Sequence, residues 1–114
     1  MKYAIHGFSQ KVAVDYGLDA DHLLILRCLI DSMNPKGAGM KIIEGVRYYL
    51  VDYKVLLESL PILKLTRDQL CRKFQELYEA GMLEHQYIRQ DRVSSYWKTG
   101  VNFLSLTPGG LVDA

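Results

Sequence analysis

The strongest constraint on the fold of this 114-residue chain is a short amphipathic helix in its second half. Four apolar side chains recur there at the spacing of one helix face, namely Leu70, Phe74, Leu77 and Tyr78. Thr66 is a good N-cap for such a helix, and Gly81 is a good stop. We therefore expect a helix over residues 67–80, whose apolar stripe must be covered by other parts of the chain.

A second predicted helix precedes it, and a tight turn separates the two. Asp52 can cap a helix over residues 53–60, whose expected inward side chains are Val55, Leu56 and Leu60. Pro61 cannot continue that helix and disfavours helical geometry at the residue before it. The turn is too apolar for an exposed loop, so we expect three of its residues to fill the junction: Ile62, Leu63 and Leu65.

Two further helices are predicted nearer the N-terminus. Ser9 and Gly17 mark the limits of a short helix over residues 10–16. Asp19 caps the next helix, over residues 22–33, which is apolar almost all round. That pattern is typical of a central helix packed on several sides.

Between these helices and the turn lies a small β element. Residues 34–39 are a loop by composition, and residues 41–43 and 47–51 are rich in β-branched and aromatic side chains. The two segments flank Glu44-Gly45. They form either a hairpin or one short strand with an irregular partner.

After Gly81 the pattern changes to the alternation of a strand. One face would carry the alternate side chains Leu83, His85, Tyr87 and Arg89. Residues 90–92 are a turn candidate, and we expect strand again over 93–98 and 101–106, with Gly100 as a bulge or kink. Residues 1–108 are long enough for one domain, and 109–114 are expected to be a tail or the start of a linker.

The order of these elements predicts the fold class. Two helices joined by a tight turn, the second leading through glycine into a hairpin, are typical of a winged helix-turn-helix. We therefore expect an α+β, mainly α, winged helix-turn-helix with a C-terminal β-hairpin wing. In that geometry the helix at 67–80 enters the major groove of double-stranded DNA, and the wing at 83–106 lies along the backbone.

The polar side chains of this helix and the wing suit such a role. Arg72 and Gln69 can make paired hydrogen bonds to the edges of guanine and adenine. Lys64, Thr66 and Lys73 suit phosphates. The full set of expected DNA contacts is Lys64, Thr66, Arg67, Gln69, Arg72, Lys73, Arg89, Arg92, Ser94 and Lys98. A solvated helix face carries similar residues, so the prediction depends on the order of the elements.

The net charge of only +1 at first sight argues against DNA binding, because domains that bind DNA are typically strongly basic. The charges are, however, unevenly placed. Residues 61–73 carry four basic residues against one acidic residue, and residues 85–98 carry three against one. Local potential governs docking, so binding remains compatible with the sequence. We expect low affinity for nonspecific DNA, with useful binding dependent on base contacts, dimerisation or a further domain.

The segment at 40–107 resembles the winged-helix domains of phage and plasmid replication proteins of Gram-positive bacteria. The residues that carry the resemblance are the aromatic strand YYLVD, the helix end LP-I-L, the basic helix and the exit Leu77-Tyr78-Glu79-Ala80-Gly81-Met82-Leu83-Glu84. The family includes replisome organisers, RepA-type plasmid initiators and the N-terminal domain of the primosomal protein DnaD. The resemblance implies DNA binding or assembly in replication initiation, with other replication proteins as partners.

Two alternatives remain open on the residues alone. In DnaD-like members the domain can serve mainly for self-association, which would make the chain a homo-oligomer such as a dimer. Four aromatic side chains could build that interface, namely Tyr48, Tyr49, Tyr96 and Trp97. Tyr96 and Trp97 could equally be a cross-strand packing pair. The second alternative is a transcriptional repressor with the same fold.

The sequence gives no indication of catalysis or of a cofactor. His6, His22 and His85 lack metal-site spacing, and no HExxH, CxxC, GxSxG or P-loop pattern occurs. Cys28 and Cys71 lie in apolar helical patterns and read as reduced thiols. The longest apolar run is interrupted by Arg27, so we expect no membrane span. The N-terminal residues MKYAIHGFSQ contain no apolar h-region after the lysine, so we expect no secretory signal. We therefore expect a cytoplasmic binding module.

Overall fold

A computed structural model describes residues 4–5, 7–33, 39–89 and 93–107 of the chain. In chain order the elements are β1 (Ala4–Ile5), β2 (Phe8–Ser9), α1 (Gln10–Asp15), α2 (Ala20–Ser32), β3 (Met40–Ile43), β4 (Val46–Leu50), α3 (Tyr53–Ser59), the 3-10 turn η1 (Pro61–Leu63), α4 (Arg67–Glu79), β5 (Leu83–Arg89), β6 (Val93–Thr99) and α5 (Phe103–Leu106). The predicted tail at 109–114 lies outside the described residues.

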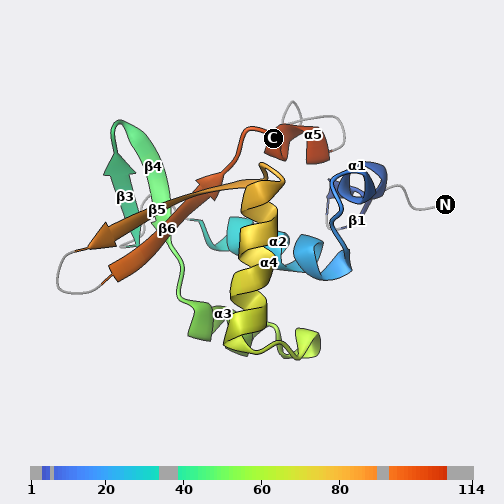
Figure 1. Cartoon of the computed structure of the whole chain (residues 1–114), viewed down its shortest axis with the longest axis horizontal. Coiled ribbons are helices and arrows are strands. Elements are labelled where there is room, and N and C mark those ends of the chain that lie inside the picture. Colours follow the sequence, from blue (N-terminus) through green and yellow to red (C-terminus); the bar gives the residue numbers. More distant parts are fainter. Residues whose placement is uncertain (1–3, 6, 34–38, 90–92, 108–114) are drawn as a thin grey trace.

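The helices pack together with α2 behind α4, and the sheet extends to one side of them (Figure 1). Helix α4 contacts α2, α3 and β5, so it is the central element that joins the others. The α3–turn–α4 unit and the β5–β6 hairpin are present in the predicted order. The structure therefore confirms the mixed α+β fold class.

The sheet contains a connection that we did not predict. Its strand order is β3-β4-β6-β5 with antiparallel pairing throughout, so the two hairpins join along β4 and β6. The joining pairs are Tyr49 with Trp97 and Leu50 with Tyr96. The 41–51 segment is a hairpin, which settles the alternative left open above. The short β1–β2 ribbon was also not predicted.

Side-chain caps begin the helices at the predicted residues. Ser9, Asp19, Asp52 and Thr66 each accept a hydrogen bond from a backbone N–H in the first turn of the helix that follows. Such a cap contributes about 1 kcal/mol, because it satisfies a donor that has no partner within the helix. Helix α2 begins at Ala20 and ends at Ser32, so it starts slightly earlier than the apolar pattern indicates.

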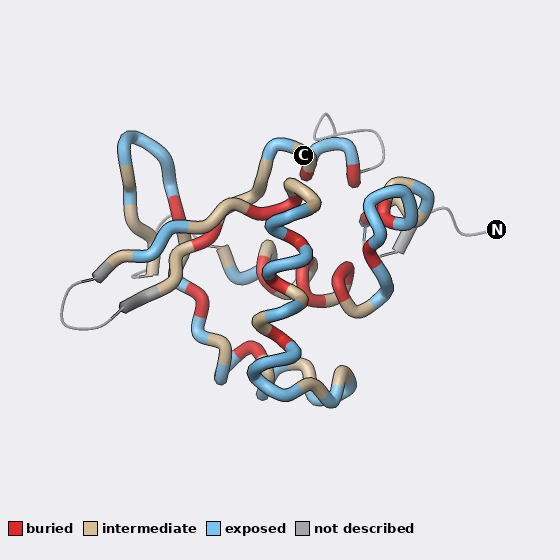
Figure 2. Tube along the Cα trace, viewed as in Figure 1, coloured by how far each residue is buried: buried red, intermediate tan, exposed pale blue. Residues whose placement is uncertain are grey.

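The core lies mainly among the helices and includes most of the predicted stripe of α4 (Figure 2). Leu70, Phe74 and Leu77 are buried, and the core residues of α2 lie against them. Tyr78 is 47% exposed, so its assignment to the stripe is wrong. Because successive helical residues are about 100° apart, Tyr78 turns away from the face defined by Leu77.

An aromatic cluster fixes the sheet to the helices. The ring of Phe74 meets Tyr53 edge-on at 5.2 Å and Trp97 at 5.0 Å, and the ring of His85 stacks on Trp97 at 4.0 Å. The indole nitrogen of Trp97 donates to the hydroxyl of Tyr53 at 3.2 Å. Rings from α3, α4, β5 and β6 therefore meet at one point, which positions the wing relative to α4.

The prediction of strand over residues 101–106 is wrong, because Phe103–Leu106 is a short helix. The backbone N–H of Gly100 donates to Met82, and that of Asn102 donates to Gly81, so the chain bends around the end of α4. Phe103 and Leu106 then lie on one helical face and are buried. The wing consequently ends at Thr99.

Two side chains near the turn also differ from expectation. Val55 is 55% exposed and Ile62 is 77% exposed. In α3 the residues packed on the core follow three- and four-residue spacing, and they are Tyr53, Leu56, Leu57 and Leu60. Val55 falls outside that spacing. The 3-10 turn directs Leu63 inward and leaves Ile62 outside, whereas Leu63 and Leu65 pack at the junction as expected.

Candidate nucleic-acid interface

The N-terminus of α4 is closed by a reciprocal cap. The backbone N–H of Gln69 donates to Thr66 Oγ1 at 3.2 Å, and that of Thr66 donates to Gln69 Oε1 at 2.8 Å. Two side chains expected to contact DNA therefore also hold the first turn of the helix. The cap uses the amide oxygen of Gln69, whereas the amide nitrogen is the group that could donate to a base or a phosphate.

Lys64 lies at the exit of the η1 turn in an unusual conformation. Its φ is +53°, in the left-handed region, and its side chain is exposed. That region costs a residue with a Cβ about 1–2 kcal/mol, so the packed turn on both sides must hold Lys64 there. The strain lets the chain reverse between Leu63 and the cap of α4. It also brings the ammonium-bearing residue directly before the helix.

Arg67 and Arg72 complete the exposed basic residues of this region. The guanidinium of Arg67 lies over the ring of Tyr53 at 5.7 Å, a cation–π contact that restrains it at the start of α4. Arg72 is exposed and makes no ion pair with any described residue. Beside it lies a hollow of about 310 Å³, whose lining residues are Asp21, Leu65, Gln69, Arg72, Lys73 and Glu76.

Lys73 and Lys98, by contrast, form ion pairs within the fold. Lys73 Nζ lies 2.8 Å from Asp19 Oδ2, and Lys98 Nζ lies 2.7 Å from Glu84 Oε2. Their side chains are only 18% and 27% exposed. Both lysines were expected to contact DNA as available cations. In this structure a carboxylate of the same chain already balances each charge.

Three of the four expected wing contacts have side chains outside those described: Arg89, Arg92 and Ser94. Arg89 is the last residue of β5 and pairs with Val93, and Ser94 pairs with Ile88 across the hairpin. The side chains of Arg89 and Ser94 are not among those described, and Arg92 lies outside the described residues. Their DNA contacts remain predictions.

The four aromatic residues expected at an interface separate into two pairs. Tyr48 is 8% exposed and Trp97 is 3% exposed, so both contribute to packing within the chain. This burial contradicts their expected place on a partner surface. Tyr49 and Tyr96 are half-buried, and Lys41 Nζ lies over the ring of Tyr96 at 5.9 Å. Tyr49 and Tyr96 stay predictions, but they lie on opposite faces of the sheet, because Tyr49 pairs with Trp97.

A buried histidine links α2 to α4 and was not singled out from the sequence. His22 is 3% exposed; its Nδ1 accepts from the backbone N–H of Asp19 at 2.9 Å. Nε2 therefore carries the proton and donates to Glu76 Oε1 at 2.8 Å. The sequence pattern that could have indicated this role is a polar residue three positions after the cap Asp19, in a largely apolar helix.

The Asp19 carboxylate is the second link between these helices. It accepts from the backbone N–H of His22 at 3.1 Å and from Lys73 Nζ at 2.8 Å. Partial burial opposes ionisation, but the hydrogen bonds from Lys73 and His22 prevail and lower the pKa of Asp19 below its ordinary value. Asp19 is therefore ionised at neutral pH.

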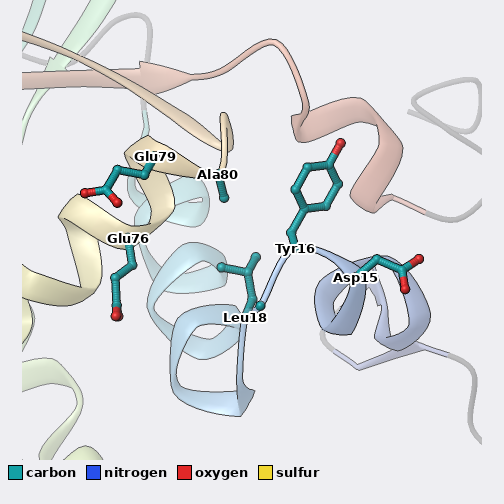
Figure 3. Close-up of a pocket in the computed structure, with 7 residues that line it drawn as sticks. Asp15, Tyr16, Leu18, Glu76, Glu79 and Ala80 are labelled. Carbon is teal, nitrogen blue, oxygen red and sulfur yellow. The ribbon is translucent and has the colours of Figure 1, made fainter.

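The C-terminal half of α4 is acidic and limits the extent of the basic surface. Glu76 and Glu79 project from α4 beside a cleft of about 420 Å³, whose far wall comes from the end of α1 (Figure 3). Leu18 and Ala80 also line this cleft, and Asp15 lies on its other side. Carboxylates repel phosphate, so a duplex on α4 would contact its N-terminal half.

Other kinds of site receive no support within the described part of the chain. No group of three or more histidine, cysteine, aspartate or glutamate residues there could hold a metal ion. Cys28 and Cys71 are free and half-buried, and burial raises the pKa of the Cys28 thiol. Among the helices described, none is long and apolar enough to cross a membrane.

Comparison with known proteins found a similarity in structure and none in sequence. No protein-family description and no curated protein sequence matches it. It is similar in structure to the reduced form of the transcriptional regulator YodB from B. subtilis, with a TM-score of 0.51 and 17% identity. The match covers 83% of this chain and 74% of the regulator. This likeness and the observed element order show the winged helix-turn-helix fold.

Proposed function

We propose that this chain is a module that binds double-stranded DNA through the N-terminal half of α4 and the β5–β6 wing. The observation that carries the proposal is a group of three exposed basic side chains at the start of α4, none ion-paired to a described residue: Lys64, Arg67 and Arg72. They lie where the fold presents its recognition helix, and the acidic half of α4 lies beyond them.

Each group has a defined part in this mechanism. Lys64 and Arg67 bind phosphates at the edge of the groove and set the register of α4. Arg72 donates two parallel hydrogen bonds to the N7 and O6 atoms of guanine, and the amide nitrogen of Gln69 donates to a neighbouring base or phosphate. The strands β5 and β6 bring the wing alongside the backbone. No catalytic step and no cofactor form part of this proposal.

Control of transcription is the cellular role that we favour, because the similar solved structure is that of a transcriptional regulator. Replication initiation is the second candidate, and it is supported by the resemblance of residues 40–107 described above. Both roles require duplex binding. A promoter-reporter assay and a plasmid-maintenance assay, each with the wild-type and DNA-binding-deficient proteins, would separate them.

The proposal is tested by selecting bound sequences from a random duplex pool and then measuring affinity by fluorescence anisotropy. We expect enrichment of sites that contain guanine, and an affinity that falls steeply as salt rises from 50 to 200 mM, a range typical for phosphate-dependent binding. Single-stranded DNA of the selected sequence is the control. Absence of duplex binding, or binding that is independent of salt, would overturn the proposal.

A self-association role is the alternative, and it is supported by the half-buried Tyr96, which shares one face of the sheet with the exposed Leu50. Light scattering at micromolar concentration separates it from the first proposal. A monomer that binds duplex DNA excludes self-association as the main role. A dimer that Tyr96→Ser converts to a monomer, without DNA binding in either state, would favour it.

A further inference from the structure

The pairing of Lys73 with Asp19 changes how many cations the DNA-facing helix presents. These residues are 54 positions apart and join the middle of α4 to the N-cap of α2 with an Nζ–Oδ2 distance of 2.8 Å. An isolated exposed ion pair contributes little, because both side chains must be ordered to form it. The surroundings of Asp19 determine whether this pair is of that kind.

Hydrogen bonds with His22 hold the Asp19 carboxylate in place independently of Lys73. Its other oxygen accepts from the backbone N–H of His22 at 3.1 Å, and its own backbone N–H donates to the His22 ring at 2.9 Å. One helical turn along α4, Glu76 accepts from the same His22 ring at 2.8 Å. Lys73 therefore meets a carboxylate whose position is set, which lowers the entropic cost of the pair.

A second pair of the same kind lies in the wing. Lys98 Nζ lies 2.7 Å from Glu84 Oε2 on the neighbouring strand and donates to the carbonyl of Thr99 at 2.9 Å. Both elements expected to face DNA thus contain a lysine balanced by a carboxylate. Lys64, Arg67 and Arg72 form no such pair with a described residue. The basic residues of the surface therefore fall into two classes.

Resting on the DNA-binding role proposed above, we propose that Asp19 is a specificity-determining residue that occupies Lys73 in place of a DNA phosphate. A lysine–phosphate contact adds affinity for duplexes of every sequence, and nonspecific binding consists almost entirely of such contacts. By keeping Lys73 from phosphates, Asp19 lowers this sequence-independent contribution. Recognition then depends more heavily on the base contacts of Arg72.

Asp19→Asn is the sharpest test, because asparagine caps a helix about as well as aspartate and the fold is retained. In nonspecific duplex binding we expect the slope of log affinity against log salt to steepen by about 0.9, the value for one added phosphate contact. Asp15→Asn is the matched control, since it changes net charge equally on α1, where Asp15 is exposed and forms no ion pair with Lys73, whose partner is Asp19. It should leave the slope unchanged.

Lys73→Ala completes a double-mutant cycle. In the wild-type background it should leave the salt slope unchanged, and in the Asp19→Asn background it should remove the added 0.9, which represents one phosphate contact. The inference is overturned if Asp19→Asn behaves like Asp15→Asn. It is also overturned if Lys73→Ala alone flattens the slope, because Lys73 would then already contact phosphate.

A measurement without DNA separates this inference from the proposed function. Reductive methylation of the lysine amines, followed by mass spectrometry, should label Lys73 more slowly than Lys64 in the wild type. In Asp19→Asn the rate at Lys73 should rise several-fold towards that of Lys64. Unchanged rates overturn the pairing whatever the DNA result. If Lys73 is methylated more slowly than Lys64 as expected but the wild type binds no duplex, the DNA-binding role is overturned. The specificity role of Asp19 is then overturned as well.

Discussion

Gly100 lies against the backbone of Gly81 so closely that a Cβ on Gly100 would overlap the carbonyl oxygen of Gly81. Gly81 ends α4 with φ +79°, and the N–H groups of Gly81 and Met82 donate to Tyr78 and Leu77 in a Schellman arrangement. The end of α4 and the end of the wing thus cross at two glycines. This crossing fixes the wing at its base.

Gly100→Ala should therefore destabilise the fold by more than about 2 kcal/mol, because the backbone atoms of Gly81 and Leu83 cannot yield as a flexible side chain can. Gly39→Ala is the control, since its Cβ would make an ordinary 3.5 Å contact with Leu50. Urea unfolding followed by tryptophan fluorescence measures both. Similar midpoints for the two variants would contradict the close approach.

Local signals explain why α4 and its neighbours could be predicted. Thr66, Gly81 and the Leu70–Phe74–Leu77 spacing all lie within one short segment, so periodicity and capping were sufficient. The helix at Phe103–Leu106 depends instead on hydrogen bonds from Gly100 and Asn102 to the end of α4. No local pattern contains that information.

The residue types at the candidate site could be predicted from the sequence. Which of the basic side chains are already ion-paired within the chain could not. Exposed Lys64, Arg67 and Arg72 follow from the position of α4 after the turn. The pairs Lys73–Asp19 and Lys98–Glu84 are tertiary contacts, so a count of basic residues by segment overestimates the available positive charge. The join between β4 and β6 is equally nonlocal and could not be read from alternation alone.

The β3–β4 turn offers a stabilising substitution. Ile43 pairs with Val46 across a two-residue turn, in which Glu44 and Gly45 have φ of +52° and +79°. Asparagine tolerates the left-handed region better than glutamate, so Glu44→Asn should raise the free energy of unfolding by about 0.5–1 kcal/mol. Gly45→Ala should lower it by a similar amount. Chemical unfolding of both variants checks the prediction, and a loss of stability in Glu44→Asn would contradict it.

His85 should make stability depend on pH. Its Nε2 is buried and has no hydrogen-bond partner among the described residues, and burial lowers the pKa of His85 below 6.5. The unfolded state therefore binds the proton more readily than the folded state. Stability should be full above about pH 6.5, the unfolded value, and should fall as the pH drops below it.

His85→Phe tests this origin while retaining a ring that can stack on Trp97 at a similar distance to the present 4.0 Å. Removing the unsatisfied nitrogen should stabilise the protein by about 1 kcal/mol at pH 7.5 and flatten the stability curve between pH 5 and 7, the range in which histidine titrates. Tyr87→Phe, at an exposed ring beside His85, is the control and should leave that curve unchanged. An equally steep curve in His85→Phe would assign the pH dependence to other groups.

Arg72 should contribute to sequence discrimination, whereas Lys64 should contribute to affinity for any duplex. Arg72→Ala is expected to weaken binding to the selected site by about 1–3 kcal/mol and to affect a random duplex much less, because base contacts are lost. Lys64→Ala should weaken both duplexes alike and reduce the salt slope by about 0.9. Lys11→Ala, which removes an exposed charge on α1, is the control for net charge. Anisotropy titrations at several salt concentrations distinguish these outcomes. Equal losses on both duplexes for Arg72→Ala would place Arg72 on the phosphate backbone instead of a base edge.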